Sequence, residues 1–230
     1  MPIKPILFNT EMVRAILDGR KSCTRRIVKP QQLVGLLPDK CKNGVPEEFL
    51  KEKKFMFKPY CDMTDIELIN TAYKAPYQPD DILYVRETWC ALPVNEAGHM
   101  RGHSVYYYKA DRDLRPEGWR GNWHPSIHMP KEAARIWLKV TDVRVKRLQE
   151  ITENGALKEG AQGVRCDHDA IGVYGCTDCM NTGWLEPPTL EFMGIWDSTI
   201  KKTELDRYGW NANPWVWVIE FERCDKPEGE

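Results

Sequence analysis

The sequence has no long apolar run and no excess of charge of either sign. Its 33 Lys and Arg residues balance 34 Asp and Glu residues, for a formal net charge of -1 at pH 7. A protein that binds a long nucleic-acid duplex along a continuous basic track is normally far more basic. No segment approaches the roughly 20 apolar residues that cross a bilayer, and the first residues lack the apolar core of a secretory signal. The sequence therefore predicts neither a membrane protein nor an exported one.

Internal repeats and low-complexity tracts are also absent. The 230 residues are 42% hydrophobic and 29% charged, a globular composition with enough chain to bury a sizeable core. The eight cysteines do not indicate a disulfide framework, because a chain of this length does not need one and no secretion signal precedes them. We therefore expect reduced thiols and a cytoplasmic location.

Hydrophobic periodicity predicts short elements along the chain. Residues 3–8 are expected to form a strand, and Asn9 or Thr10 to cap a helix that ends at Gly19. A polar, strongly basic turn is expected over residues 20–26. Further strands are predicted at residues 82–89, 104–110, 136–147 and 215–221.

The last of these strands is expected to be central in a sheet, because both of its alternating faces are apolar. Two more short helices are predicted. One is capped by Thr152 and closed by Gly160, and the other is capped by Thr189. The second helix is expected to turn three side chains inward: Leu190, Met193 and Trp196.

Residues 30–80 and 91–128 show no sustained hydrophobic period and are expected to be irregular, apart from the strand near 104–110. Strands at uneven spacing with three short helices indicate an α+β protein around a small mixed or barrel-like sheet. Length favours one domain over residues 1–230 that carries insertions.

Four motifs follow one another in a fixed order. They are Gly19–Thr24 (GRKSCT), Asp80–Glu87 (DDILYVRE), Ile151–Glu153 (ITE) leading to Glu159–Gly160, and Trp215–Phe221 (WVWVIEF). In this order they resemble the G-x-K-x-x-T signature, the GD-x-L-x-V strand, the IT-E-E helix and the closing strand of the ASCH family, although Asp80 stands where glycine is usual. The chain is most similar to the long forms found in bacteriophages and prophages, for which the location would be the host cytosol.

This resemblance implies a PUA-like mixed β-barrel with short flanking helices. It leaves irregular insertions at about 30–79, 91–130 and 161–188 outside the family's pattern. The barrel of the family holds a nucleotide or a flipped base. One bacterial branch removes the acetyl group from N4-acetylcytidine, and its proposed catalytic lysine, threonine and glutamate fall on Lys21, Thr24 and Glu159.

Amide hydrolysis needs a nucleophile, a base and donors for the developing oxyanion. The hydroxyl of Thr24 would be the nucleophile. A lysine can act as the base only where burial or neighbouring positive charge favours its neutral form. Glu159 would orient Lys21 or carry a proton to the leaving amine. A structural interpretation stays open, with Lys21 and Thr24 on an exposed turn and Glu159 paired with a nearby cation.

The same residues can bind a ligand without turning it over. Arginines near the lysine would hold a phosphate or a base edge, and Trp89 would stack on the base. Core packing is the alternative role for Trp89. Two basic clusters, residues 14–29 and 131–147, can guide one nucleic-acid strand. The candidate binding residues are Arg20, Arg25, Arg26, Arg86, Glu87 and Trp89.

Three cysteines and a histidine lie close together in the third insertion. Cys176 and Cys179 form a C-x-x-C pair in a glycine-flanked turn, the spacing of a zinc knuckle. Cys166 and His168 can complete the site, with a nearby aspartate as the alternative to the histidine. Four protein ligands leave no open position, so the Zn²⁺ would be structural. A redox pair or free thiols are the alternatives.

The sequence thus leaves three hypotheses of function. The first is recognition of a nucleotide or modified base carried by RNA or another nucleic acid, with RNA preferred over DNA. The second is hydrolysis of an acyl group from a modified cytidine. The third is a phage accessory protein that binds a host protein through its insertions.

Overall fold

The computed structural model of the chain describes residues 2–29, 64–93, 104–111, 121–167, 177–180 and 182–227. Most of the first predicted insertion, 30–79, and parts of the other two, 91–130 and 161–188, lie outside these ranges. The chain divides into two compact units, each assembled from segments far apart in the sequence. Unit 1 comprises Met1–Ser22, Pro79–Thr141 and Phe221–Glu230, and unit 2 comprises Cys23–Gln78 and Asp142–Glu220.

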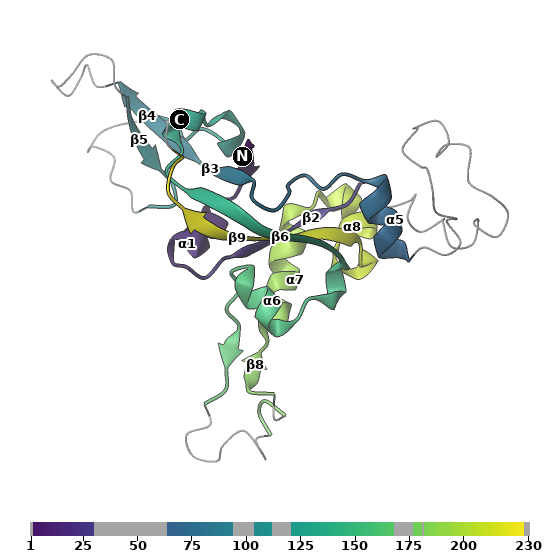
Figure 1. Cartoon of the computed structure of the whole chain (residues 1–230). Helices are drawn as coiled ribbons and strands as arrows, with labels where there is room; N and C mark the ends of the chain where they lie inside the picture. The colour runs from purple at the N-terminus through teal and green to yellow at the C-terminus, as the bar shows by residue number, and fades with distance from the viewer. Residues whose placement is uncertain are drawn as a thin grey trace. The chain divides into compact units, whose positions relative to one another are not determined.

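Five strands form the main sheet, in the hydrogen-bonded order β1 (Ile3–Leu7), β3 (Ile82–Arg86), β6 (Trp137–Arg147), β9 (Trp215–Cys224) and β2 (Cys23–Ile27) (Figure 1). The sheet is mixed, because β1 runs parallel to β3, whereas β3 with β6 and β2 with β9 are antiparallel. Together with the helices, this confirms the α+β class. Among the described strands no pairing closes the sheet from β2 back to β1, so a closed barrel is not observed there.

Unit 1 also contains helix α1 (Thr10–Leu17), the antiparallel pair β4 (Trp89–Pro93) and β5 (Ser104–Tyr108), and two 3₁₀ turns, η4 (Ser126–His128) and η5 (Lys131–Ala133). The side chain of Asn9 caps α1 by accepting from the backbone N–H of Met12 at 2.8 Å. Gly19 ends the helix region with φ of +74°. Val13 and Ile16 are buried. These features confirm the predicted strand, cap and helix end.

Unit 2 contains α5 (Asp65–Ala72), α6 (Glu153–Lys158), α7 (Pro188–Thr199), α8 (Leu205–Tyr208), the short antiparallel pair β7 (Val164–Arg165) and β8 (Trp184–Glu186), and the 3₁₀ turns η6 (Leu148–Glu150), η7 (Lys202–Glu204) and η8 (Trp210–Ala212). Helices α6 and α7 pack together (Figure 1). Their core joins them to the strands β2 and β9. It consists of Cys23, Leu148, Ile151, Ala156, Ala161, Phe192, Trp196, Val216 and Val218.

The interior position of β9 confirms the prediction of a central strand. It lies between β6 and β2 in the sheet, and Val216, Val218 and Ile219 are completely buried. By contrast, the prediction of a basic turn over residues 20–26 is wrong from Cys23 onward. The backbone there pairs with β9 as strand β2, and the strand buries polar side chains that would otherwise indicate a surface turn.

Two helices differ from the sequence prediction. The segment expected to be irregular contains α5, which begins with a capping box between Thr64 and Glu67. Helix α7 begins at Pro188 rather than after Thr189, because proline favours the first helical position. Leu190, expected to face the core, is 51% exposed. The buried residues of α7 are Pro188, Phe192 and Trp196.

Within the described ranges, no helix combines the length and the apolar character needed to cross a membrane.

The central strand sets the first testable prediction. We expect Ile219→Ala to lower the free energy of unfolding by about 2–5 kcal/mol, because it leaves a cavity in a fully buried site. Chemical denaturation measures the change. The matched control is Ile127→Ala, at a side chain that is 57% exposed and should change stability by less than about 0.5 kcal/mol. Equal effects of the two variants would contradict the central position of β9.

Candidate functional site

A buried ion pair lies in unit 2 between strand β2 and the end of helix α6. Nη1 of Arg25 donates to Oε1 of Glu159 at 3.0 Å, and the two side chains are 6% and 5% exposed. Glu159 is the C-cap of α6, and Gly160 turns the chain immediately afterwards with φ of +101°. Thr152 caps the other end of α6 by accepting from the N–H of Gly155. The helix caps thus hold the carboxylate opposite β2.

The surroundings of Arg25 are both aromatic and closely packed. Its guanidinium lies over the ring of Phe192, 5.6 Å from the centroid. A Cβ atom on Gly155 would come within 3.4 Å of Nη2, so the glycine leaves room for the guanidinium. The Nε atom of Arg25 is buried and has no hydrogen-bond partner among the described residues. A buried donor of this kind needs an explanation, such as a water or a ligand.

Thr24 and Arg26 lie on the other face of β2 from Arg25, because side chains alternate along a strand. Thr24 is buried and pairs with Ile219 of β9. Burial lowers the pKa of Arg26, while interactions with Tyr77 and Glu159 oppose that shift. Unit 2 therefore places Arg25 with Glu159 on one face of β2 and Thr24 with Arg26 on the other.

Lys21 belongs to unit 1, where it follows helix α1. Its backbone N–H donates to the carbonyl of Ala15 at 2.9 Å, and its side chain is buried, with Nζ 5.6 Å from the ring centroid of Phe8. The interpretation of Lys21 and Thr24 as residues of an exposed turn is therefore wrong. The part of that interpretation that paired Glu159 with a cation is confirmed, and the cation is Arg25.

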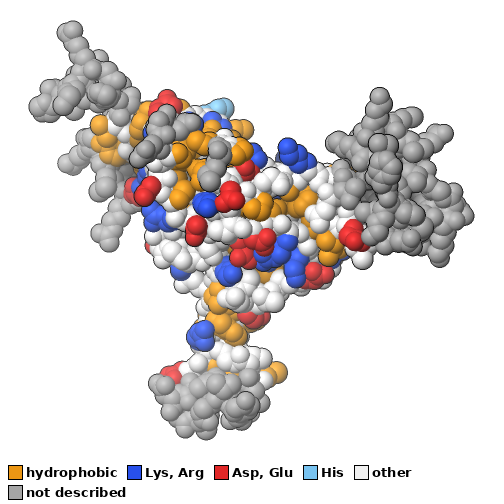
Figure 2. Space-filling model, in the orientation of Figure 1, with side chains coloured by type: hydrophobic (Ala, Val, Ile, Leu, Met, Phe, Trp, Pro, Cys, Tyr) orange, Lys and Arg blue, Asp and Glu red, His pale blue; other side chains and the backbone are white. Residues whose placement is uncertain are grey.

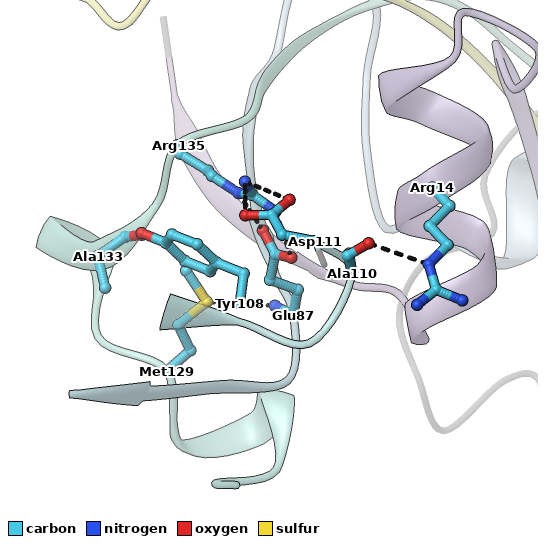
Figure 3. A network of polar contacts seen from close by, with 8 residues as sticks. All are labelled: Arg14, Glu87, Tyr108, Ala110, Asp111, Met129, Ala133 and Arg135. Atoms are coloured by element: carbon cyan, nitrogen blue, oxygen red, sulfur yellow. Dashed lines mark hydrogen bonds and ion pairs between the residues drawn. The ribbon is translucent and has the colours of Figure 1, made fainter. Parts of the chain in front are cut away.

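A second buried carboxylate, Glu87, is the centre of a polar network in unit 1 (Figure 3). Glu87 is completely buried, and Arg135 donates to both of its oxygens, from Nε at 2.9 Å and from Nη2 at 3.0 Å. Nη1 of Arg135 donates to Asp111 at 2.7 and 2.9 Å. The guanidinium stacks on the ring of Tyr108, 4.0 Å from its centroid. Arg135, Asp111 and Tyr108 were not recognised from the sequence, because no spacing pattern connects them with Glu87.

Burial dominates the ionisation of this network. It raises the pKa of Glu87, against the opposing effect of the hydrogen bonds and charge of Arg135. Burial also raises the pKa of Tyr108 to about 12. The phenol of Tyr108 donates to the carbonyl of Ala133 at 2.6 Å. One arginine thus joins the ends of β3 and β5 to the segment that leads into β6.

The remaining candidate residues of unit 1 make separate contacts. Nε of Arg86 donates to the carbonyl of Met129 at 2.7 Å, and Arg20 pairs with Asp18 at the surface. Trp89 is half-buried, with ring centroids of Tyr106 and His124 at 5.8 and 5.2 Å. Figure 2 shows hydrophobic side chains gathered over the β4–β5 pair to which Trp89 belongs. Trp89 is therefore part of an aromatic cluster.

Two of the four predicted zinc ligands, His168 and Cys176, lie outside the described residues. Cys166 directly follows β7, and its N–H donates to the carbonyl of Gly183, beside β8, at 3.1 Å. Cys179 is buried in a tight turn that closes through a hydrogen bond to its carbonyl from Thr182. Among the described residues no three potential metal ligands lie together.

No model of a known protein family matches the chain, and neither a curated protein nor a solved structure matches it with significance.

The Glu87 network gives a prediction about pH. We expect Arg135→Met to lower the free energy of unfolding by about 3 kcal/mol at neutral pH, because it leaves a buried carboxylate without its cation. The pKa of Glu87 is higher in the folded than in the unfolded state, so its protonated form stabilises the folded protein. That contribution to the free energy of unfolding is lost as pH rises through the folded pKa. Stability of the variant should therefore recover, relative to the parent, as pH falls from 7 towards 5.

Denaturation curves at several pH values measure this recovery. The control is Glu87→Gln combined with Arg135→Met, in which the titrating group is gone and the additional pH dependence should disappear. A single variant that followed the pH profile of the parent would show that Glu87 does not depend on Arg135.

Proposed function

We propose that the protein recognises a nucleotide or a modified base through the polar residues of β2 and α6, as the resemblance to the ASCH family implies. The observation that supports this is the buried Arg25–Glu159 pair, with a guanidinium N–H that has no partner among the described residues. The PUA-like barrel of that family is part of the same proposal.

Stability alone is a poor reason for such a pair. The desolvation of two charges commonly equals or exceeds their attraction, and apolar residues of similar volume often stabilise a core as well or better. The surrounding core of unit 2 is strongly apolar, with Phe192, Val218 and Ala156 close by in the same cluster. A pair kept in that setting is better explained by a polar ligand.

The chemistry of the pair suits a nucleobase. A carboxylate accepts hydrogen bonds from the exocyclic amino group of cytosine, and an arginine donates to carbonyl or ring-nitrogen acceptors. Glu159 would accept from the base, and Arg25 would hold Glu159 in place. The preferred ligand class is therefore cytidine and its N4-modified derivatives.

Binding of free nucleosides tests this proposal. We expect cytidine-type nucleosides to bind, and Glu159→Gln to weaken them about 10- to 100-fold, since a hydrogen bond to a charged group is worth about 1.5–3 kcal/mol. Isothermal titration calorimetry measures the affinity. The matched control is Glu150→Gln, an exposed carboxylate of unit 2, which should bind like the parent. Absence of binding across a panel of nucleosides would contradict the proposal.

A second candidate is hydrolysis of N4-acetylcytidine by Lys21, Thr24 and Glu159. The observation in its favour is that each side chain is buried, Lys21 in unit 1 and Thr24 and Glu159 on opposite faces of β2 in unit 2, since shielding from water strengthens electrostatic catalysis. Chromatography of the products distinguishes the candidates. Turnover that Lys21→Ala or Thr24→Ala abolishes would support hydrolysis, whereas binding without product would support recognition alone.

We also propose a structural Zn²⁺ held by Cys166, His168, Cys176 and Cys179. The support is the tight turn at Cys179 and the pairing of β7 with β8, which joins the two limbs of this insertion next to Cys166. We expect about one zinc per chain, and Cys176→Ser to lose most of it, by elemental analysis. Cys23→Ser, at a cysteine buried in the core of unit 2, is the control and should keep the metal. Unchanged zinc in Cys176→Ser would contradict this site.

A further inference from the structure

Three strands of unit 2 bring cations and aromatic rings to one end of the sheet. The N–H of Val28, just beyond β2, donates to the carbonyl of Trp215 at the start of β9, at 3.0 Å. On the other side of β9, the N–H of Leu148, just beyond β6, donates to the carbonyl of Pro214, also at 3.0 Å. The far ends of the two basic sequence clusters, 14–29 and 131–147, therefore flank the same end of β9.

The cations at this end lie over buried rings. Arg147 is 4.2 Å from the ring centroid of Trp215, and Lys29 and Arg207 are 5.2 and 5.0 Å from that of Tyr208. Both rings are buried, whereas Lys29 and Arg207 are exposed and Arg147 is half-exposed. We call Lys29, Arg147, Arg207, Tyr208 and Trp215 the basic–aromatic end.

In the described part of the chain, these three cations share the absence of a carboxylate partner with others such as Lys146 and Arg165, but they are grouped at one end of the sheet. Within that part of the chain, none of Lys29, Arg147 and Arg207 forms an ion pair with a carboxylate. By contrast, the side chains Arg144 and Lys158 pair with Glu220, and Arg144 also pairs with Asp142. Positive charge is thus neutralised along the middle of β6 and β9 but not at the basic–aromatic end, although the acidic side chains Glu150 and Asp206 lie nearby in the sequence.

We propose that the basic–aromatic end binds the phosphate backbone of a single-stranded nucleic acid. Lys29, Arg147 and Arg207 contact successive phosphates, and the rings beneath hold the cations in place. Three cations suit a single strand better than a duplex, which requires a longer basic surface. Lys29 is five residues beyond Thr24, at most about 18 Å of extended chain, so a strand of a few nucleotides can reach both. This inference rests on the proposed recognition of a base and names the polymer that carries it.

Salt dependence tests the proposal. Three phosphate contacts on a single strand correspond to a slope of log K against log salt of about -2, a loss of roughly 20-fold in affinity between 50 and 200 mM salt. We expect fluorescence anisotropy with a labelled 12-nucleotide RNA to give this slope. Each of Lys29→Gln, Arg147→Gln and Arg207→Gln should reduce its magnitude by about 0.7, and the triple variant should bring it close to zero. The loss should be uniform across RNA sequences.

The chain offers a matched control in Arg165, which stacks on Trp184 at 4.5 Å in the same unit. Arg165→Gln should leave the slope unchanged, and Arg147→Lys should preserve it because the charge remains. Thermal unfolding of each variant shows whether the rings beneath still pack. A triple variant that is folded and keeps the parent's slope overturns the proposal, as does a parent protein that does not bind RNA. An equal loss in Arg165→Gln also overturns it, because the effect would then be one of total charge.

Free nucleosides, which have no phosphate chain, separate this proposal from the proposed function. The three Gln variants should bind them like the parent, whereas Glu159→Gln should not. RNA binding with the expected slope but without nucleoside binding would uphold the basic–aromatic end and reject base recognition. The reverse result would reject the basic–aromatic end alone. A single-stranded DNA of the same sequence should bind with the same slope, since phosphates are the groups contacted; a zero slope on DNA would overturn the assignment to phosphates.

Discussion

The pairing of β2 with β9 is the constraint on which the arrangement of unit 2 depends. Because β9 is buried on both faces, the neighbouring strand β2 lies in an apolar environment. The middle residues of β2 are nevertheless Thr24, Arg25 and Arg26. The structure accommodates them by giving Arg25 a carboxylate from α6 and an aromatic face from α7. The positions of both helices are therefore linked to the charge on one edge strand.

The elements that the sequence predicted well are those specified by local chemistry. The Asn9 cap, the Gly19 end of α1 and the two-faced apolar pattern of β9 all act within a few residues, and the structure has all three. β2 was missed because its basic composition is typical of a surface turn. Only its pairing with β9, almost 200 residues away in the chain, makes it a strand.

The candidate site was predictable to a similar, limited degree. The resemblance singled out Thr24 and Glu159, and the structure places both among buried polar residues of one unit. It did not indicate that Arg25 would pair with Glu159, since that depends on the rotation of α6 against β2. The network around Glu87 was beyond sequence analysis for the same reason: Arg135 contacts groups 24 and 48 residues away, and no local pattern records such distances.

The near-zero net charge of the chain at first argues against any nucleic-acid partner, and the placement of the charges resolves the difficulty. Several buried or partly buried acidic groups are paired within the fold: Glu159 with Arg25, Glu87 and Asp111 with Arg135, and Glu220 with Arg144. A neutral total can coexist with a local excess of positive charge, because among the described residues no carboxylate forms an ion pair with Lys29, Arg147 or Arg207, although Asp206 and Glu150 lie nearby in the sequence. What a nucleic-acid strand would meet at the basic–aromatic end is the local potential, which decays within about a Debye length of 10 Å, and not the sum over the sequence.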